Sequence, residues 1–402
     1  MQGERKVTCC VVGGGPAGMM AGLLLARAGV STLVLEKHKD FLRDFRGDTV
    51  HPSTLEILDQ LGLYDAFLQR PHTRIERLRG RFGTLEAVFA DFTHLPTRAK
   101  FIALMPQWDF LDFLVSHART YPTFEVMMEA EATGLRSADG KVIGVEVKTP
   151  QGSLRVTSDL VLGCDGRHSL VRQQTQLPVE DLGAPMDVLW FRLSRKPSDP
   201  DDPAGSFGAG HILVAINRTD YWQCGFVIAK GSFEETKRLG LDSVRDTIAA
   251  LAPFLADRTH EIQSFDDFRL LTVGVDRLTR WHRPGVLCIG DAAHTMSPVG
   301  GVGINLAIQD AVAAANLLAR PLNEKRVSEA DLAAVQARRL RPTQIIQWVQ
   351  VQIQKRVISG VLGGAGQSNP PLALRLIASF PALARVPARL LGLGFRRERV
   401  EI

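Results

Sequence analysis

The distribution of apolar residues predicts a parallel β-sheet assembled from four separated stretches of the chain. Residues 7–12, 32–35, 159–164 and 286–289 are short, nearly continuous apolar runs without polar alternation. Such runs are typical of strands that are covered on both faces, as in parallel sheets. A glycine or an acidic residue follows each run, so polar chemistry is expected at the carboxyl edge of this sheet.

Two intervening parts of the chain, residues 70–105 and 178–280, predict a second, antiparallel sheet with turn residues between its strands. We expect strands at 188–193, 211–217, 221–229 and 265–272, and helices at 54–61, 108–118, 242–255, 303–319 and 329–358. Pro342 should break or kink the last helix. The fold class is α/β. The domains are 1–69 with 106–177 and 281–330, then 70–105 with 178–280, and a helical C-terminal region at 331–402.

The first apolar run leads into a glycine-rich turn that is typical of dinucleotide binding. Gly13, Gly15 and Gly18 form G-x-G-x-x-G between a strand and an Ala/Leu-rich helix. The first glycine permits the tight turn, the second lets a diphosphate approach the backbone, and the third lets helix pack on strand. Glu36 ends the next strand, where its carboxylate can accept hydrogen bonds from ribose hydroxyls. The turn predicts an adenine dinucleotide but leaves open whether it is a nicotinamide or a flavin.

Two later strand ends carry further candidate chemistry. Asp165-Gly166 follows one apolar strand, and Gly290-Asp291 follows another. After the second comes Pro298 and then a glycine run, residues 300–303, at the start of a helix. Backbone N–H groups at such a helix start suit a group that carries negative charge, for example the edge of a reduced flavin.

With these three motifs in this order, the sequence resembles the class A flavoprotein monooxygenases, the para-hydroxybenzoate hydroxylase-like family, from residue 5 to about residue 320. The resemblance implies a Rossmann-like FAD-binding domain of glutathione-reductase type with an inserted substrate domain. It implies that FAD is bound by Gly13, Gly15, Pro16, Ala17, Gly18, Glu36, Lys37, Arg46, Gln107, Asp165, Gly166, Gly290, Asp291, Pro298, Gly300, Gly301, Val302, Gly303, Ile304 and Asn305.

The resemblance also implies a reaction. NADH or NADPH docks briefly and reduces FAD, and the reduced flavin takes up O2 to form a C4a-hydroperoxide. One oxygen atom then passes to an aromatic or polyketide-like substrate, while the protein positions the partners and excludes water.

The resemblance places Pro298 and Gly301 beside the isoalloxazine ring, and the strand 221–229 over it. In that strand, Trp222 lies on one face and Gln223 on the other, because side chains alternate. Trp222 therefore either faces a flat substrate or packs the domain core. The base that activates the substrate is open, and the candidates are His51, His72, His211 and Asp48.

Other functions are open at this point. A reductase of the geranylgeranyl-reductase type shares the FAD fold. A flavin-dependent halogenase would add a W-x-W-x-I-P segment, which this sequence lacks. A flavin-bearing binding or redox-sensing protein without turnover is a further alternative.

Composition and charge limit the kinds of partner that the protein can have. The chain has 402 residues, a net charge of +5 and five cysteines, none in a metal-site or disulfide spacing. With a polar N-terminus, this predicts a reduced, cytoplasmic protein, a monomer or homodimer. Positive charge is concentrated in residues 332–402, but no nucleic-acid motif accompanies it, so no nucleic-acid partner is expected. This basic segment is suited to lie on an anionic membrane surface, or else to pack on the first domain with its arginines solvated.

Overall fold

The computed structural model describes residues 3–42, 49–83, 85–200, 204–208, 210–363 and 372–402. Arg46 and Asp48, two candidates from the sequence, lie outside the described residues.

The predicted parallel sheet is present and holds the main core. Its strands follow the order β19-β20-β11-β1-β2-β8, and β10 and β9 extend it from β11. The strands are β1 (Gly3–Val12), β2 (Thr32–Leu35), β8 (Phe124–Met127), β9 (Glu131–Ala138), β10 (Lys141–Thr149), β11 (Gly152–Gly163), β19 (His282–Arg283) and β20 (Val286–Cys288). The pairs β20–β11, β11–β1, β1–β2 and β2–β8 are parallel, which confirms the interpretation of the apolar runs.

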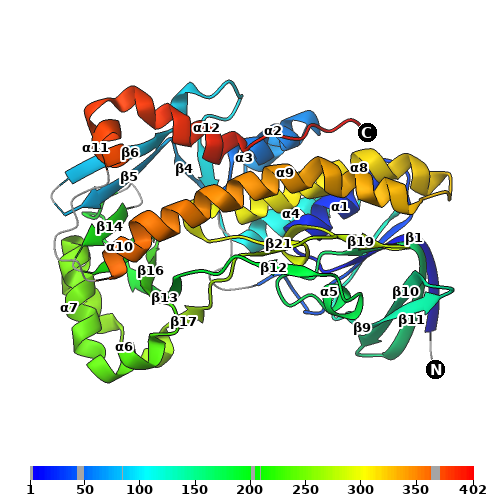
Figure 1. The fold of residues 1–402 in the computed structure, drawn as a ribbon, viewed down its shortest axis with the longest axis horizontal. Coiled ribbons are helices and arrows are strands. Elements are labelled where there is room, and N and C mark those ends of the chain that lie inside the picture. The colour runs from blue at the N-terminus through cyan, green and yellow to red at the C-terminus, as the bar shows by residue number, and fades with distance from the viewer. Residues whose placement is uncertain (1–2, 43–48, 84, 201–203, 209, 364–371) are drawn as a thin grey trace.

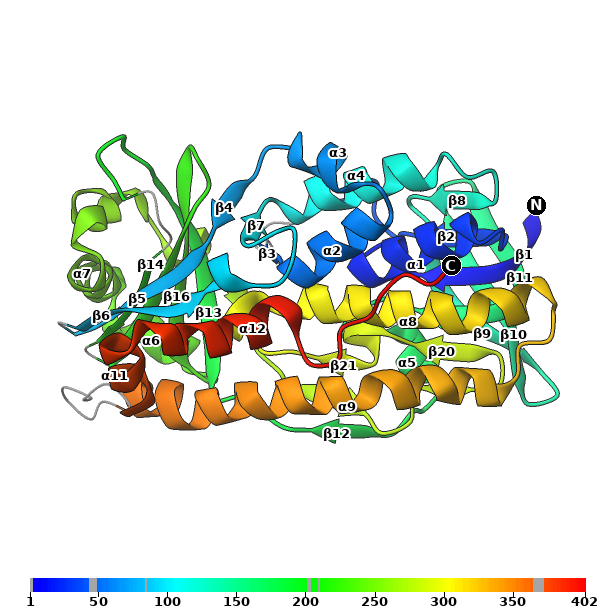
Figure 2. The same cartoon turned by 90° about the horizontal axis from the view of Figure 1, so that it is seen from above.

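Helices pack on this sheet and on one another (Figures 1 and 2). They are α1 (Pro16–Arg27), α2 (Pro52–Gln60), α3 (Tyr64–Leu68), α4 (Gln107–Ala118), α5 (Leu170–Gln174) and α8 (Gly303–Asn323). Helix α1 packs on both α4 and α8. The segment Val299–Asn323 is apolar enough to span a bilayer, but 78% of its apolar window is buried inside the molecule, as in a core helix of a folded domain.

A second sheet is built from both intervening parts of the chain. Its order is β17-β13-β16-β15-β14-β5-β6, and only the β14–β5 pair is parallel. The strands are β5 (Arg77–Phe82), β6 (Leu85–Asp91), β13 (Met186–Ser194), β14 (Ala204–Gly208), β15 (His211–Asn217), β16 (Tyr221–Ala229) and β17 (Arg269–Leu271). Helices α6 (Phe233–Leu239) and α7 (Leu241–Leu251) belong to this part, and apolar residues of α7 share a buried cluster with one face of the sheet. The α/β fold class with its inserted sheet is thus confirmed, while the domain boundaries stay predictions.

Two small sheets link the large ones. One comprises β3 (Thr49–Val50), β7 (Ile102–Leu104) and β4 (Thr73–Ile75), and the other β12 (Val179–Asp181), β18 (Asp276–Leu278) and β21 (His294–Thr295).

The C-terminal region is helical and crosses the molecule twice. Helix α9 (Glu329–Ile353) runs along the long axis to the second sheet, and Pro342 does not interrupt it (Figure 1). A π-helical turn (Gln354–Ile358) and α10 (Ser359–Leu362) follow, and then α11 (Leu372–Ser379) and α12 (Arg385–Leu393). After α12, residues 394–402 return beside α8 without regular structure (Figure 2).

Candidate active site

The three motifs meet at one edge of the parallel sheet. Val12 pairs with both Gly163 and Leu35, and Gly163 pairs with Cys288. The segments that follow these four strand ends therefore lie side by side. An extended ligand can cross all of them, as in other open parallel sheets.

The glycines of the first turn have separate roles. A Cβ atom on Gly13, where φ is +104°, would lie 2.5 Å from the Cys164 carbonyl oxygen, and one on Gly18 would overlap the Gly13 carbonyl oxygen. At these two residues, backbone atoms of neighbouring segments occupy the space that a side chain would need. A Cβ atom on Gly15, the N-cap residue of α1, would meet nothing within 4 Å. Open space thus lies in front of the helix N-terminus, as a diphosphate requires.

The Glu36 carboxylate is held at the end of β2. It accepts hydrogen bonds from the backbone N–H groups of Gly14 (3.0 Å) and His38 (3.1 Å) and is buried. Lys37, the next residue, is exposed. The acid therefore sits against the glycine turn, where a ribose of a dinucleotide would lie.

Asp165 orders the second turn. Its carboxylate accepts hydrogen bonds from Ser169 Oγ (2.5 Å) and Val171 N–H (3.2 Å) at the start of α5. Burial raises the pKa of this carboxyl, although the hydrogen bonds oppose the shift. Gly166 follows at φ +81°.

The third turn is wedged between two helices. A Cβ atom on Gly290 would lie 3.0 Å from Ala17 Cβ in α1 and 3.2 Å from Ala307 Cβ in α8. This contact brings half-buried Asp291 close to the first glycine turn, although the two motifs are far apart in the sequence.

The glycine loop after Pro298 is shaped by its hydrogen bonds to β3. Gly300 (φ +78°) and Gly301 (φ +62°) adopt left-handed backbone that favours glycine. Thr49 Oγ1 donates to the Gly301 carbonyl (2.8 Å), and Asn305 Nδ2 donates to the Thr49 carbonyl (3.1 Å). Helix α8 begins directly after this loop, so its first N–H groups have no partner within the helix.

A protein family described as an FAD binding domain matches residues 6–349. The chain belongs to the class A FAD-dependent monooxygenases. It is 34% identical over 385 residues to 6-methylpretetramide 4-monooxygenase of Streptomyces rimosus, covering 95% of this chain and 91% of that protein.

Two further comparisons agree with this family. The chain is 30% identical to 12-dehydrotetracycline 5-monooxygenase/anhydrotetracycline 6-monooxygenase of the same species over 75% of its length, which spans 60% of that protein. The solved structure of p-nitrophenol 4-monooxygenase PnpA from Pseudomonas putida has the same fold, with a TM-score of 0.78, 21% identity and coverage of 98% and 100%. The monooxygenase is thus an oxidoreductase that uses FAD and O2 to hydroxylate an aromatic or polyketide-like substrate, and NAD(P)H is the reductant typical of the family.

The open space at Gly15, the fixed Glu36 carboxylate and the first turn of α8 fit FAD in an extended form. Gln107, also expected to contact the cofactor, opens α4 and is half-buried.

His51, the first candidate base of the monooxygenase, is fully buried beside the glycine loop. Its backbone N–H donates to Asn305 Oδ1 (2.9 Å), and its Nδ1 lies 2.7 Å from the Leu391 carbonyl oxygen. Because a carbonyl only accepts, Nδ1 carries the proton and Nε2 is a free acceptor. Nε2 is buried and has no hydrogen-bond partner in the described part of the chain. Burial lowers the pKa of His51 from 6.5 to about 4, against the opposing effect of the Leu391 hydrogen bond, so the imidazole is neutral at pH 7.

The other two candidate histidines pack against phenylalanine rings rather than against the glycine loop. His72 is stacked on Phe101 in the turn before β4, with 6.2 Å between ring centroids. His211 stacks on Phe226 at 5.0 Å, and Phe226 belongs to the buried cluster that includes residues of α7.

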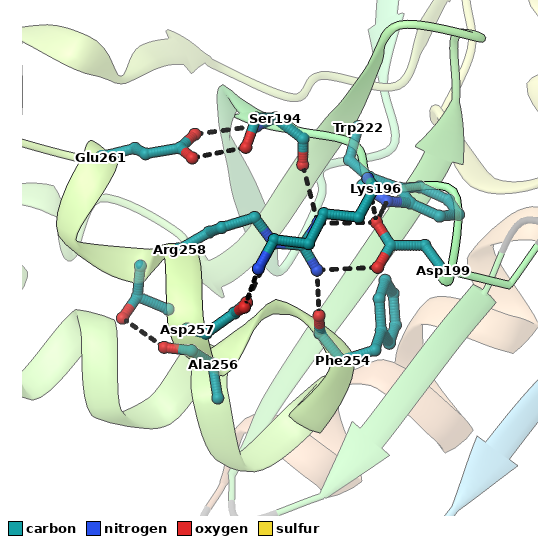
Figure 3. A network of polar contacts seen from close by, with 10 residues as sticks. Ser194, Lys196, Asp199, Trp222, Phe254, Ala256, Asp257, Arg258 and Glu261 are labelled. Carbon is teal, nitrogen blue, oxygen red and sulfur yellow. Dashed lines mark hydrogen bonds and ion pairs between the residues drawn. The ribbon is translucent and has the colours of Figure 1, made fainter.

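Trp222 lies in the core of the second sheet rather than over the cofactor edge. It is fully buried with Phe226 and residues of α7, and its Nε1 donates to Asp199 Oδ2 at 2.9 Å. Asp199 in turn binds the Arg258 guanidinium through both oxygens (Figure 3). Of the two alternatives for Trp222, the structure shows the one in which it packs the domain core, so its side chain does not face the cofactor edge.

The opposite face of this sheet meets the glycine loop. Phe82 and Phe207 are stacked with ring centroids 4.1 Å apart and 7° between planes, and half-buried Trp190 lies over Gly225. Val299, next to Pro298, packs against the same cluster. These aromatic residues were missed from the sequence, although alternation in 188–193 places Trp190 opposite Phe191 and offered a signal.

Proposed function

We propose that the substrate of this monooxygenase is a flat molecule of several fused aromatic rings. The proposal rests on the contact between Val299 of the glycine loop and the aromatic face that carries Phe82, Phe207 and Trp190. Aromatic side chains favour stacked or edge contacts with other rings, and such pairs add about 0.5–1.5 kcal/mol each beyond burial. The names of two relatives, which give 6-methylpretetramide and anhydrotetracycline as their substrates, support a substrate of this class.

The chain's own residues then have three tasks. Gly15 and the N-terminus of α1 leave room for the diphosphate, and Glu36 orients a ribose. The loop from Pro298 to Gly301 would line the ring end of the cofactor, and the apolar sheet face would exclude water there. When bound, FAD accepts reducing equivalents from NAD(P)H and activates O2 for transfer of one oxygen atom.

His51 is the base candidate that the geometry favours. It is the one histidine among the three proposed that lies against Asn305 at the glycine loop, and its neutral Nε2 can accept a hydrogen bond from a substrate hydroxyl. Pro298 and Gly301 stay proposals as residues beside the flavin ring.

Steady-state assays with purified, FAD-loaded protein test the proposal. Oxidation of NADH and NADPH, oxygen uptake and peroxide release are measured with 1,8-dihydroxyanthraquinone and related fused-ring phenols, and with single-ring phenols as controls. We expect fused-ring phenols to stimulate NAD(P)H oxidation with oxygen incorporated into product. Equal stimulation by single-ring phenols, or none by any fused-ring compound, would contradict the proposed substrate class.

The same assays address the alternative functions. Turnover of an isoprenoid alkene without oxygen would indicate a reductase, and halide-dependent turnover a halogenase. The names of the curated relatives favour neither outcome.

The location of the protein in the cell, and any partner other than a small aromatic substrate, are also proposals. We expect a cytoplasmic monomer or homodimer. Leu372, Phe380 and Val386 are exposed near arginines of α11 and α12, which suits contact with an anionic membrane. Helix α12 itself packs by its other side on β6 and α2. Sedimentation with vesicles of phosphatidylglycerol tests the contact, and protein that stays in the supernatant would rule it out.

A further inference from the structure

The chain end lies against the loop that holds the cofactor. We infer that residues 385–402, here called the C-terminal brace, position the flavin loop (residues 290–301) from both of its ends, and that Glu398 is the positioning residue. This inference rests on the proposed function only in that the loop binds FAD.

At the glycine end of the loop, α12 makes direct contact. A Cβ atom on Gly300 would lie 2.6 Å from Leu391 Cδ2, so the leucine packs closely over the glycine backbone. The Leu391 carbonyl oxygen also accepts the His51 Nδ1 hydrogen bond at 2.7 Å. One residue of the brace therefore contacts both the flavin loop and the segment that begins α2.

At the other end of the loop, Asp310 of α8 gathers three donors. Its carboxylate accepts from Gly290 N–H (3.1 Å), His294 Nε2 (2.6 Å) and Arg339 Nε (2.8 Å). Burial by itself would raise the pKa of the Asp310 carboxyl, but the facing His294 and Arg339 outweigh it and lower the pKa. Asp310 thus ties the turn that carries Asp291 to helix α9.

Glu398 completes this chain of contacts. Arg339 Nη1 lies 3.4 Å from Glu398 Oε1, and Arg338 Nε donates to Glu398 Oε2 at 2.8 Å. The side chains of Arg339 and Glu398 are 1% and 2% exposed, so their charges depend on each other rather than on water. Loss of the Glu398 charge would leave Arg339 with Asp310 as its one carboxylate partner among the described ion pairs.

Side chains of the helices that flank the cofactor hold the rest of the brace. Asn316 Nδ2 of α8 donates to the Arg399 carbonyl (2.7 Å), and Gln60 Oε1 of α2 accepts from Val400 N–H (2.8 Å). Arg397 pairs with Glu56 of α2. Because the brace binds both α8 and α2, it fixes these two helices relative to each other. Both helices begin beside the glycine loop.

Glu398→Gln tests the inference, and Glu401→Gln is its matched control. Both glutamates pair with Arg338, but the Glu401 side chain is 60% exposed. The readouts are the FAD dissociation constant from flavin fluorescence, the visible flavin spectrum and the flavin reduction potential, all without substrate. We expect Glu398→Gln to weaken FAD binding about tenfold or more, as for loss of one charged hydrogen bond, and to shift the spectrum and potential. Glu401→Gln should match the unmodified protein, and Glu398→Asp should recover part of the loss.

A second variant covers the case in which Glu398→Gln fails to fold. Leu391→Ala removes the contact with Gly300 but keeps the carbonyl that binds His51, and Val386→Ala, at a 70% exposed site of α12, is its control. We expect a changed flavin spectrum for Leu391→Ala alone. Unchanged flavin spectra and FAD affinity in Leu391→Ala and in any folded Glu398→Gln, or equal changes in variant and control, would overturn the inference. An unmodified protein that binds FAD but hydroxylates nothing would instead overturn the proposed function.

Discussion

Two glycines of the same turn should respond in opposite ways to one added methyl group. Gly15 and Gly18 both lie in the G-x-G-x-x-G turn, and neither has a positive φ, so backbone strain is not the difference between them. The difference is space. A Cβ atom on Gly15 meets nothing within 4 Å, whereas one on Gly18 overlaps the Gly13 carbonyl oxygen and lies 3.2 Å from Val11 Cγ1.

The magnitudes follow from these distances. For Gly18→Ala, the obstacle is backbone that cannot turn away, so α1 must move off β1; such overpacking costs about 1–3 kcal/mol of folding free energy. For Gly15→Ala, backbone compatible with alanine gains about 0.4–1 kcal/mol from reduced unfolded-state entropy, and the poorer N-cap offsets part of it. The added methyl group instead occupies the space for the diphosphate. Overpacking of the same size there would weaken FAD binding by roughly tenfold to a hundredfold.

Thermal unfolding of the apoprotein and FAD titration by fluorescence separate the two effects. Gly15→Ala should unfold within a few degrees of the unmodified apoprotein yet bind FAD poorly. Gly18→Ala should unfold at clearly lower temperature without FAD. If Gly15→Ala binds FAD with unchanged affinity, the diphosphate does not approach the backbone at this residue and the assignment of the turn is wrong.

Three further predictions address the second sheet and His51. Trp222→Phe removes the hydrogen bond to Asp199 and should lower the free energy of unfolding by about 2 kcal/mol in urea titrations, with kcat nearly unchanged; a large loss of kcat at unchanged stability would return Trp222 to the active site. Phe207→Ala removes the stack with Phe82 and should raise KM about fivefold for a fused-ring phenol but less for a single-ring phenol, and an equal rise for both would contradict an aromatic substrate face. The His51 pKa of about 4 in the folded protein lies below its ordinary 6.5, so the unfolded chain binds more protons between these values and stability should fall as the pH drops through this window. The loss should be at most roughly 3 kcal/mol by pH 4, and His51→Gln should flatten the profile; a profile with the same slope in both proteins would exclude His51 as its cause.

Local sequence patterns were sufficient to predict the cofactor side of the molecule. The turn from Gly13 to Gly18, the acid Glu36 and the strand ends before Asp165 and Gly290 depend on neighbours in the chain, and continuous apolar runs mark a parallel sheet directly. For this reason the family and the α/β fold could be predicted before any contact was known.

The substrate side could not be predicted in this way. In 188–193 large apolar residues lie on both faces, so alternation separates Phe191 from Trp190 but does not show which face meets the cofactor. The contact of His51 with Leu391 joins residues 340 positions apart, and nothing in a local pattern signals it. Pro342 was expected to disturb a helix that in fact continues through it, because the packing of α9 on α8 outweighs the local preference.

The parallel pairing of β14 with β5 has a consequence for synthesis of the chain on the ribosome. β5 and β6 leave the exit tunnel early as an isolated hairpin, and the open edge of β5 obtains its partner only when residues 204–207 have emerged. A two-stranded hairpin is marginally stable in water, and an unpaired edge invites contact with other nascent chains. Residues 77–91 are therefore the stretch in which a chaperone would have most to protect, and a pause in translation after this hairpin has emerged but before residues 204–207 have done so would prolong its exposure.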